Sequence, residues 1–324
     1  MIYISGTKDF KLNNTAVALG KFDGLHRGHK VLIDRINKLK EKGMLSVMFT
    51  FDYHPNSLFG DKEQQLIYTM KERRVIAEKM GIDILIEYPF TEETAAMEPA
   101  DFIKEVLIDK VGARFVVVGE DFRFGSHRAG NTDLLEGMSL PLGYSAVICR
   151  KVCDMIPMGF DDNLQPESRE ISATLIRKAI SKGDVELANR LLGYPFNIIG
   201  EVVHGREIGR TIGMPTANII APGTKLLPPN GVYYSKTKIF GKLYNSVTNI
   251  GYNPTVSDKN SKRIETYVYD FKGDLYGKSI EVELYHYGRP EMKFASLDAL
   301  KTQMHKDGER SKRYFAQLAS NQEK

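Results

Sequence analysis

The chain has 324 residues, of which 42% are hydrophobic and 27% are charged, so it can bury the cores of two globular domains of about 150 residues each. Its 45 basic and 41 acidic residues leave a net charge of +4 without a long basic block, which argues against a nucleic-acid-binding arm or a membrane-surface helix. No apolar run approaches the roughly 20 residues of a membrane span and the N-terminus lacks a signal-peptide pattern, so the sequence predicts a cytoplasmic protein.

The first half of the chain alternates between strand-like and helix-like patterns. Apolar runs of strand length occupy residues 15–19, 45–51, 82–86 and 114–119. Apolar residues at helical spacing lie between them, over residues 31–39, 70–80 and 102–108. Strands that alternate with helices form βαβ units, so we expect a Rossmann-like α/β domain whose parallel sheet is covered on both faces. Cys149 and Cys153 match no zinc or redox spacing, and we expect them to be structural.

The second half of the chain consists of short β-rich runs separated by Gly, Pro and Asn. These runs cover residues 198–205, 231–240, 242–251, 263–271 and 278–288. Their spacing predicts an antiparallel β-barrel or sandwich. Ser296 suits the N-cap of a closing helix, which has Leu297, Leu300 and Met304 on one side. We place the domain boundary between residues 186 and 187, in a helical pattern that runs into Gly193 and Pro195.

Residues 18–29, ALGKFDGLHRGH, place two histidines and three glycines directly after the first predicted strand. In an open α/β sheet this position borders the crevice where ligands bind. Glycines let backbone N–H groups approach phosphate oxygens, the helix N-terminus attracts anions, and two histidines three residues apart can both donate to a polyphosphate. The stretch therefore suits nucleotide chemistry, although the chain has no G-x-x-x-x-G-K-[ST] motif and hence no P-loop.

Two further segments suit phosphate or flavin binding. After the strand at 114–119, GEDFRFG sets two aromatic residues beside Arg123, which fits a flat ring that carries a phosphate, although both phenylalanines could simply pack in the core. Ser172, Thr174 and Arg177 lie where a helix would begin, so hydroxyls and N–H groups could hold a phosphate there. The alternative for this second segment is an ordinary helix cap.

The second half contains a Gly- and Pro-rich turn, GRTIGMPTAN, before Thr216 and Asn218. A rigid turn of this kind can present a hydroxyl and an amide oxygen to a cation, and both are hard oxygen ligands of the type that Mg²⁺ prefers. The alternative is a turn in which the asparagine only satisfies its own backbone.

These segments resemble the prokaryotic bifunctional riboflavin kinase/FAD synthetase family. The H-x-G-H stretch resembles the nucleotidyltransferase signature, and four further segments carry the resemblance over nearly the whole chain: VVVGEDFRFGSHRAGN, ISATLIR, GREIGRTIGMPTAN, and NIGYNPTV followed by IETYVYDF. The resemblance implies an FMN adenylyltransferase (FAD synthetase) domain over residues 1–186 and a riboflavin kinase domain over residues 187–324. It also implies ATP, riboflavin, FMN and FAD as substrates or products, and Mg²⁺ as cofactor.

The resemblance, together with the residue types, assigns the adenylylation site. The expected catalytic residues are His26, His29 and Arg177. The expected ATP-binding residues are Gly20, Phe22, Asp23, Gly24, Gly28, Ser172 and Thr174. The expected flavin-binding residues are Asp121, Phe122, Arg123, Phe124, Arg128 and Asn131. The chain departs from the family pattern I-S-S-T-x-I-R at Ala173, which removes one hydroxyl, and His54 after the second strand is left outside the catalytic set.

The kinase site is assigned in the same way. Glu265 aligns with the family glutamate that accepts the proton of the terminal ribityl hydroxyl as that oxygen attacks the γ-phosphate of ATP. Thr216 and Asn218 are the expected metal ligands, and Arg289 is expected to contact the flavin. The expected ATP-binding residues of this turn are Gly209, Gly213 and Pro215. The chain departs from the family at Tyr267, where a histidine is common.

Two alternatives from other functional classes remain open. The chain could be an FAD synthetase with an inactive kinase domain, or a flavin-responsive regulator that binds without catalysis. An adenylyltransferase for another metabolite would leave the second domain unexplained. The expected partners are small molecules, with neither nucleic acid nor membrane, and a homo-oligomer is left open.

Overall fold

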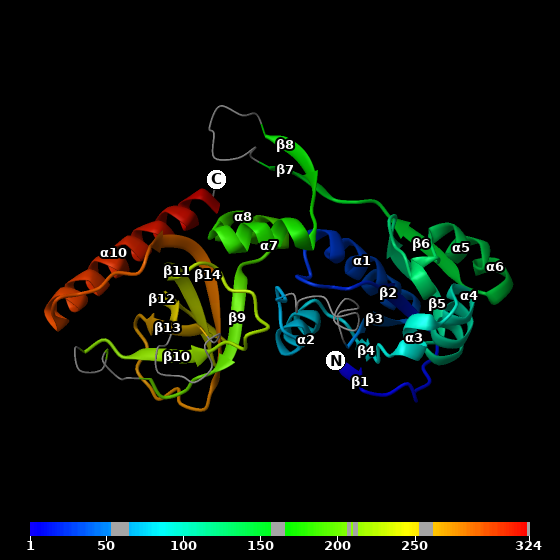
Figure 1. Ribbon diagram of the computed structural model, residues 1–324, viewed down its shortest axis with the longest axis horizontal. Helices are drawn as coiled ribbons and strands as arrows, with labels where there is room; N and C mark the ends of the chain where they lie inside the picture. Colours follow the sequence, from blue (N-terminus) through cyan, green and yellow to red (C-terminus); the bar gives the residue numbers. More distant parts are fainter. Residues whose placement is uncertain (53–64, 157–165, 206–208, 210–212, 253–261, 323–324) are drawn as a thin grey trace. The chain divides into compact units, whose positions relative to one another are not determined.

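The computed structural model describes residues 1–52, 65–156, 166–205, 209, 213–252 and 262–322 (Figure 1). The described chain forms two compact units. The first contains residues 1–64 and 68–173, and the second contains residues 65–67 and 174–324. This division falls at residues 173 and 174, whereas the boundary predicted between residues 186 and 187 stays a prediction.

The first unit is built on a six-stranded sheet with the order β1-β4-β3-β2-β5-β6 (Figure 1). The strands are β1 (Ile2–Ser5), β2 (Thr15–Leu19), β3 (Leu45–Phe51), β4 (Ile84–Tyr88), β5 (Ala113–Gly119) and β6 (Ser145–Cys149). All five pairings are parallel, and all residues of the central β2 are buried, as expected for a strand covered on both faces. The predicted parallel α/β sheet is confirmed, whereas β1 and β6, its two edge strands, were not predicted.

Helices cover this sheet. They are α1 (Arg27–Lys38), η1 (Leu39–Lys42), α2 (Met70–Lys79), α3 (Glu92–Ala96), α4 (Pro99–Asp101), the π-helix η3 (Phe102–Lys110), η4 (Ser126–Arg128), α5 (Thr132–Gly137) and α6 (Ser139–Leu142). Helix η3 packs on alternate strand residues such as Val17 and Val47. Helical spacing placed Val31, Leu32, Ile36 and Leu39 on one face, and Leu32, Ile36 and Leu39 are buried. Val31 is 39% exposed, and Ile33 is buried in its place.

A hairpin and two helices follow the sheet. Strand β7 (Cys153–Ile156) pairs antiparallel with β8 (Glu167–Glu170), and helices α7 (Ala173–Lys182) and α8 (Val185–Leu192) continue the chain. The hairpin was not predicted, because β8 reads ESRE and all four of its residues are exposed. Both cysteines are free thiols; Cys149 is half-buried and Cys153 is exposed.

The second unit contains a six-stranded antiparallel sheet with the order β10-β13-β12-β11-β14-β9. The strands are β9 (Phe196–Glu201), β10 (Thr216–Ile220), β11 (Gly231–Ile239), β12 (Lys242–Tyr252), β13 (Lys262–Val268) and β14 (Ser279–Arg289). The N–H of Val203 donates to the Asn218 carbonyl at 2.8 Å, which joins the two edges of the sheet. The predicted antiparallel barrel is therefore confirmed, although β10 was expected to be part of a turn.

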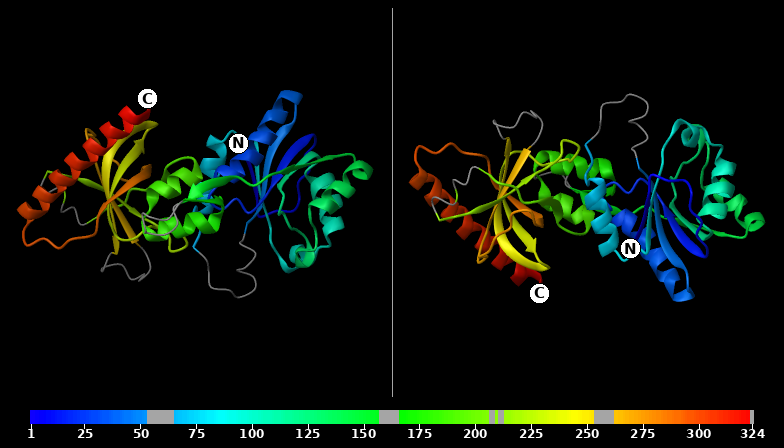
Figure 2. Two further views of the ribbon diagram at one scale, coloured as in Figure 1. Left: turned by 90° about the horizontal axis from the view of Figure 1, so that it is seen from above. Right: turned by 90° about the horizontal axis from the view of Figure 1, so that it is seen from below.

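Helix α10 (Leu297–Gln322) runs along the outside of the barrel and contacts β11 and β12 (Figure 2). The Ser296 hydroxyl accepts a hydrogen bond from the Ala299 N–H at 3.1 Å, so the predicted N-cap is confirmed. Leu297, predicted on the packed side, is 52% exposed. None of the described helices is long and apolar enough to cross a membrane.

The inside of the barrel carries a group of hydroxyls among apolar side chains. We call this group, in which every residue is fully buried, the hydroxyl cluster: Ser235, Thr237, Ser246, Thr248 and Thr266. Hydrogen bonds of 2.8–2.9 Å connect the side chains of β11, β12 and β13 within it. Each buried hydroxyl therefore has a partner, as a low-dielectric interior requires.

Candidate active sites

The strand order of the first unit reverses beside β2. The chain proceeds from β2 to β3 and β4 on one side and then returns to place β5 on the other side. At such a reversal the connections leave in opposite directions and open a crevice at the carboxyl ends of the strands, where ligands bind in open α/β sheets. The loop at residues 20–26 follows β2 and the loop at residues 120–131 follows β5. Two of the predicted motifs therefore border the same crevice.

The loop after β2 is held in a tight, partly left-handed conformation. Phe22, Gly24 and Leu25 have φ angles of 48°, 90° and 43°, and Phe22 and Leu25 are fully buried. A Cβ atom at Gly20 would lie 3.2 Å from the Phe22 ring, so glycine leaves the space that this ring fills. The Phe22 ring in turn lies 5.1 Å from the ring of His29. The buried Phe22 ring thus packs against the His29 ring.

His26 and His29 are stacked, with ring centroids 3.8 Å apart and an interplanar angle of 24°. Burial lowers the pKa of His26 to about 4. Burial, with a smaller contribution from the neighbouring His26, also lowers the pKa of His29 well below its usual value. The Nδ1 atoms of both rings are buried without a hydrogen-bond partner. The pair is therefore neutral at pH 7 and keeps ring nitrogens available to a ligand.

The glycine between the histidines leaves room for their stacking. A Cβ atom at Gly28 would lie 3.1 Å from two atoms of the His26 ring, so a larger residue would make the ring shift by a few tenths of an ångström. His26 is the N-cap residue of α1, and its side chain makes no capping hydrogen bond. The first N–H groups of α1 therefore point toward the same region as the histidines, and such a helix end favours an anion.

The loop after β5 contains both packing and exposed residues. Phe124 is 8% exposed, stacks on Phe122 at 5.6 Å and lies 5.8 Å from Phe102 in the core. The contacts of Phe124 are thus those of a core residue. Arg123 and Arg128 are exposed and remain candidates for binding an anionic ligand.

The remaining predicted residues of the adenylylation site have structural contacts of their own. The Asn131 side chain caps α5 by accepting from the Leu134 N–H at 2.9 Å. Asp121 pairs with Lys151 at 3.1 Å. Ser172 belongs to the first unit and is half-buried, whereas Thr174 and Arg177 lie on α7 in the second unit.

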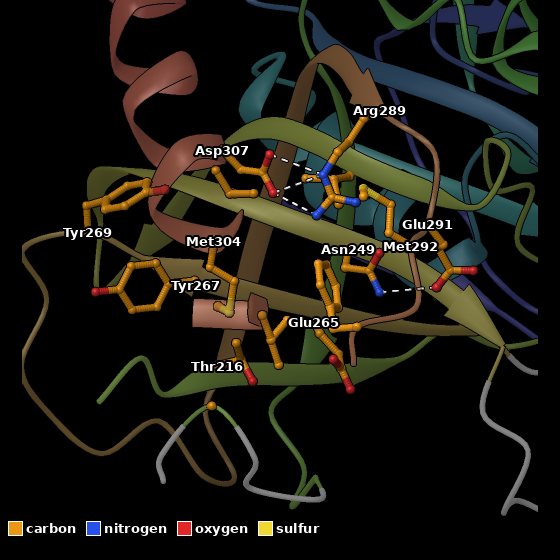
Figure 3. A pocket seen from close by; sticks show the side chains of 15 residues that line it. Thr216, Asn249, Glu265, Tyr267, Tyr269, Arg289, Glu291, Met292, Met304 and Asp307 are labelled. Atoms are coloured by element: carbon orange, nitrogen blue, oxygen red, sulfur yellow. Dashed lines mark hydrogen bonds and ion pairs between the residues drawn. The ribbon is translucent and has the colours of Figure 1, made fainter. Parts of the chain in front are cut away.

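Three strands of the barrel bring a row of polar side chains together. Asn218 on β10 lies directly opposite Glu265 on β13, and Asn249 on β12 lies opposite Glu265 from the other side. Thr216 lies opposite Tyr267 in the next outward-facing row. Residues paired across antiparallel strands share a face of the sheet, so all five belong to one surface. Figure 3 labels four of them, Thr216, Asn249, Glu265 and Tyr267.

Asn218 has an unused oxygen in a buried position. The residue is 4% exposed, its Nδ2 donates to the Thr216 carbonyl at 3.2 Å, and its Oδ1 has no hydrogen-bond partner. A Cβ atom at Gly205 would lie 2.5 Å from the Asn218 Nδ2, so glycine is needed beside this side chain. The described residues contain no group of three or more His, Cys, Asp or Glu that could hold a metal ion. The neutral oxygens fit Mg²⁺ as part of a shell that a nucleotide would complete.

Two cavities adjoin this row. The first, of about 210 Å³, lies under α10 and is lined by residues that include Thr216, Asn249, Glu265, Tyr267, Arg289 and Met304 (Figure 3). The second, of about 570 Å³, is lined by residues that include Pro215, Thr216, Asn218, Tyr267, Asp270 and Tyr276. Thr216 and Tyr267 line both cavities. Glu265 lines the first cavity, and its Oε1 atom lies 3.5 Å from Nη1 of Arg263.

Arg289 ties the barrel to α10 at the wall of the first cavity. Its guanidinium donates to both carboxylate oxygens of Asp307 at 2.7–3.1 Å, and Asp307 is 3% exposed (Figure 3). Sequence reasoning missed Asp307, which stands in no recognisable motif, and gave no role to Asn249, the first residue of NIGYNPTV. Only strand pairing and helix packing bring the two residues to the cavity. His54 and residues 253–261, which belong to the resemblance, lie outside the described residues.

Both units match known protein families. The riboflavin kinase model matches residues 192–315, and the FAD synthetase model matches residues 8–156. The bifunctional riboflavin kinase/FMN adenylyltransferase of Bacillus subtilis (strain 168) is 36% identical over 313 residues, which cover 94% of this chain and 93% of that protein. The protein of the same description from Escherichia coli (strain K12) is 34% identical over 302 residues, or 92% of each chain.

Among solved structures, a protein from Streptococcus pneumoniae described as a macrolide-efflux protein has the same two-part architecture, with a TM-score of 0.79 and 28% identity. The match covers 96% of this chain and 99% of that one. The sequence relatives, the two family models and the two described sites agree with one another. The chain therefore belongs to the family of bifunctional riboflavin kinase/FMN adenylyltransferases.

Proposed function

We propose that this chain makes FAD from riboflavin in two steps, each in its own site. The barrel, within residues 187–324, phosphorylates riboflavin with ATP to give FMN and ADP. The α/β part, within residues 1–186, transfers AMP from a second ATP to FMN and releases pyrophosphate. The observation that supports the proposal is that each unit brings together polar side chains of types suited to phosphate, the stacked His26 and His29 in one and the row around Glu265 in the other.

In the adenylylation step a phosphate oxygen of FMN attacks the α-phosphorus of ATP, and the bond to pyrophosphate breaks. Negative charge builds up on the phosphoryl oxygens, so groups that donate hydrogen bonds to them lower the barrier. His26, His29 and the first N–H groups of α1 are suited to this task, with Gly20, Phe22, Asp23, Gly24 and Gly28 shaping the loop. We assign to Arg177 the role of neutralising negative charge on the phosphates of ATP. Ser172 and Thr174 are assigned hydrogen bonds to a phosphate.

The flavin end of this site is assigned to the loop after β5. Exposed Arg123 and Arg128 can pair with the FMN phosphate or stack on its ring. Asp121, Phe122, Phe124 and Asn131 hold the loop in place through the contacts described above, so their effect on FMN binding is expected to act through the shape of the loop.

In the kinase step the terminal ribityl hydroxyl of riboflavin attacks the γ-phosphorus of ATP. We assign to Glu265 the acceptance of the hydroxyl proton, because it lines the first cavity together with Thr216 and Tyr267, which also line the second. Arg289 contributes to flavin binding by lining this cavity. We assign Gly209, Gly213 and Pro215 to the binding of the ATP phosphates. A Cβ atom at Gly209 would lie 2.3 Å from the Met214 carbonyl, so glycine allows this close approach.

Mg²⁺ would be held by the Thr216 hydroxyl and the Asn218 Oδ1. The unused buried oxygen of Asn218 is the structural feature that supports this assignment. When bound, the ion supplies positive charge to the phosphate oxygens of ATP. The proposal also includes a cytoplasmic location, small-molecule partners only and no nucleic acid, and it leaves the oligomeric state open.

The test is a pair of reactions with the purified full chain. One tube contains riboflavin, ATP and Mg²⁺, and the other contains FMN, ATP and Mg²⁺; products are separated by chromatography over time. FAD in both tubes is the expected result. FAD from FMN alone would mean that the barrel lacks kinase activity, and flavin binding without any product would support a regulator instead.

A further inference from the structure

The first residue of helix α1 is joined to the hairpin of β7 and β8. Arg27, which stands between His26 and Gly28 in the sequence, places its Nη1 atom 2.5 Å from Oδ2 of Asp154 on β7. The Asp154 side chain is 17% exposed and the Arg27 side chain is 38% exposed. Water therefore weakens this ion pair less than one on an open surface. The pair connects two elements whose residues are 127 positions apart in the chain.

Strand β7 sets the position of the residues that follow β8. Asp154 pairs with Arg169 in the antiparallel ladder. One step past the end of β8, the Ile171 N–H donates to the Val152 carbonyl at 2.8 Å, and Ile171 is 3% exposed. Ser172 is the next residue. Because the ladder and this hydrogen bond fix β8 against β7, a movement of β7 also moves Ser172.

The end of the hairpin lies next to the start of α1. A Cβ atom at Gly28 would lie 3.8 Å from the Ile171 carbonyl oxygen, which is an ordinary van der Waals distance. Ser172 comes directly after that carbonyl, so it lies near the first N–H groups of α1, the helix end that favours an anion. All these residues belong to the first unit. The hairpin end and the start of α1 thus border the same region.

We propose that Arg27 and Asp154 are positioning residues for adenylylation, whose ion pair keeps Ser172 beside His26 and His29 before ATP binds. This inference rests on the proposed function, in which Ser172 forms a hydrogen bond to an ATP phosphate. Without the ion pair, the hairpin would have to be ordered when ATP binds, and the entropy lost would weaken binding. Once ATP is bound the same contacts are made, so the chemical step changes little.

Arg27 has an alternative role, because a guanidinium beside two histidines proposed to bind phosphate can itself bind a phosphate. In the structure its charge is compensated by Asp154 at hydrogen-bond distance, which favours the positioning role. The two roles make opposite predictions. If Arg27 positions the hairpin, loss of Asp154 weakens ATP binding. If Arg27 binds phosphate, loss of Asp154 releases the guanidinium, and ATP binds equally well or better.

The test measures the KM for ATP and the kcat of FAD formation from FMN by the full chain and its variants. Riboflavin is left out, so the kinase step does not contribute. The variants are Asp154→Ala, Arg27→Gln and the double variant that carries both changes. Asp34→Ala is the matched control, because Asp34 forms an exposed ion pair with Lys30 on the same helix, at 2.6 Å.

We expect Asp154→Ala and Arg27→Gln each to raise the KM for ATP several-fold with little change in kcat. A retained kcat also shows that the first unit is folded. The double variant should resemble either single variant, because all three lose the same ion pair. Asp34→Ala should behave like the unchanged chain. An unchanged or lower KM in Asp154→Ala, or effects that multiply in the double variant, would overturn the proposal.

Ser172→Ala tests whether the ion pair acts through this serine. In that background Asp154→Ala should raise the KM for ATP only slightly, because the hydroxyl that it positions is absent. A full further increase would overturn the proposal. If Asp154→Ala does not fold, Asp154→Asn keeps the size of the side chain, removes its charge and must still raise the KM. Failure of the unchanged chain to make FAD from FMN would refute the adenylylation function itself.

Discussion

The stacked rings of His26 and His29, 3.8 Å apart, are two neutral imidazoles whose Nδ1 atoms have no hydrogen-bond partner among the described residues. Unpartnered buried polar atoms occur elsewhere in the described chain too, so it is the place of these two, between the end of a strand and the start of a helix, that fits a binding site. The same holds for the Oδ1 of Asn218 in the barrel. In each unit the unused atom lies where the proposed reaction needs a contact to phosphate or its cation.

Replacing His29 by alanine should impair adenylylation and spare the kinase. The imidazole is expected to donate to a phosphoryl oxygen in the transition state, and loss of one such donor typically costs about 100-fold or more in kcat. FAD formation from FMN and FMN formation from riboflavin are measured on the same preparation. The second activity shows that the barrel is intact, and equal loss of both would contradict separate sites.

The pH dependence of stability should report the buried histidines. The pKa of His26 is lowered from 6.5 to about 4, so between these pH values the unfolded chain binds a proton that the folded chain does not. The free energy of unfolding therefore has its full value above pH 6.5. It decreases as the pH falls toward 4, by up to about 3 kcal/mol from His26.

Urea denaturation at a series of pH values measures the slope of the unfolding free energy against pH. In His26→Asn this slope should be smaller, because the asparagine side chain does not titrate. An unchanged slope in that variant would show that other groups cause the acid sensitivity. A polyphosphate bound to the site should also reduce the slope, since it favours the protonated imidazole.

Asn218→Ala should lower kinase activity strongly at a small cost in stability. Among the described residues the Oδ1 has no hydrogen-bond partner, so the hydrogen bond lost is that of Nδ2 to the Thr216 carbonyl, and we expect the unfolding free energy to fall by about 1 kcal/mol. The apparent Mg²⁺ requirement should rise. Asn245→Ala, at an exposed position on β12, is the matched control and should behave like the unchanged chain.

Glu265→Gln should lower the kcat of the kinase by roughly 100-fold to 10,000-fold, the range attributed to a positioned general base. The amide keeps the size of the side chain but cannot accept the proton. Glu283→Gln changes a carboxylate elsewhere in the barrel, one that accepts from the Tyr285 hydroxyl, and serves as the control. Comparable losses in both variants would argue against a specific role for Glu265.

Asp307→Ala should destabilise the barrel, because it leaves the Arg289 guanidinium without its partner in a site where both side chains are mostly buried. Removing one member of a buried ion pair typically costs about 3–5 kcal/mol. We also expect a higher KM for riboflavin, since α10 would lose a contact that holds it over the first cavity. Thermal unfolding and steady-state kinetics measure the two effects, and an unchanged Tm would contradict this account of the ion pair.

The architecture was predictable where local pattern and tertiary environment agree. Strands β2 and β3 coincide with their predicted runs, because buried central strands are apolar throughout and end at glycine or polar residues. The edge strand β10 was missed because its first residues belong to the P-T-A-N sequence, which is typical of a turn. The exposed strand β8 carries no apolar signal at all.

The site was predictable only in part, for a related reason. Motifs point to His26, His29, Asn218 and Glu265, whose residue types and neighbours are informative. The row that joins Asn218 and Glu265 to Asn249 depends on strand register, which sequence spacing does not reveal. In the same way, the partner of Arg289 lies on a distant helix, and the ring of Phe124 turned inward to the core instead of remaining on the loop surface.

The hydroxyl cluster inside the barrel has a consequence for the chemistry on the other face. A shift of β13 by one residue against β12 would turn Thr266 outward and bring Glu265 into the apolar interior. The hydrogen bond between the Thr248 and Thr266 hydroxyls makes that shift costly, because it would be lost. The hydroxyl cluster thus favours the strand register that aligns the polar row. Substitutions among its serine and threonine residues, which lie away from the substrates, should therefore lower the kinase rate.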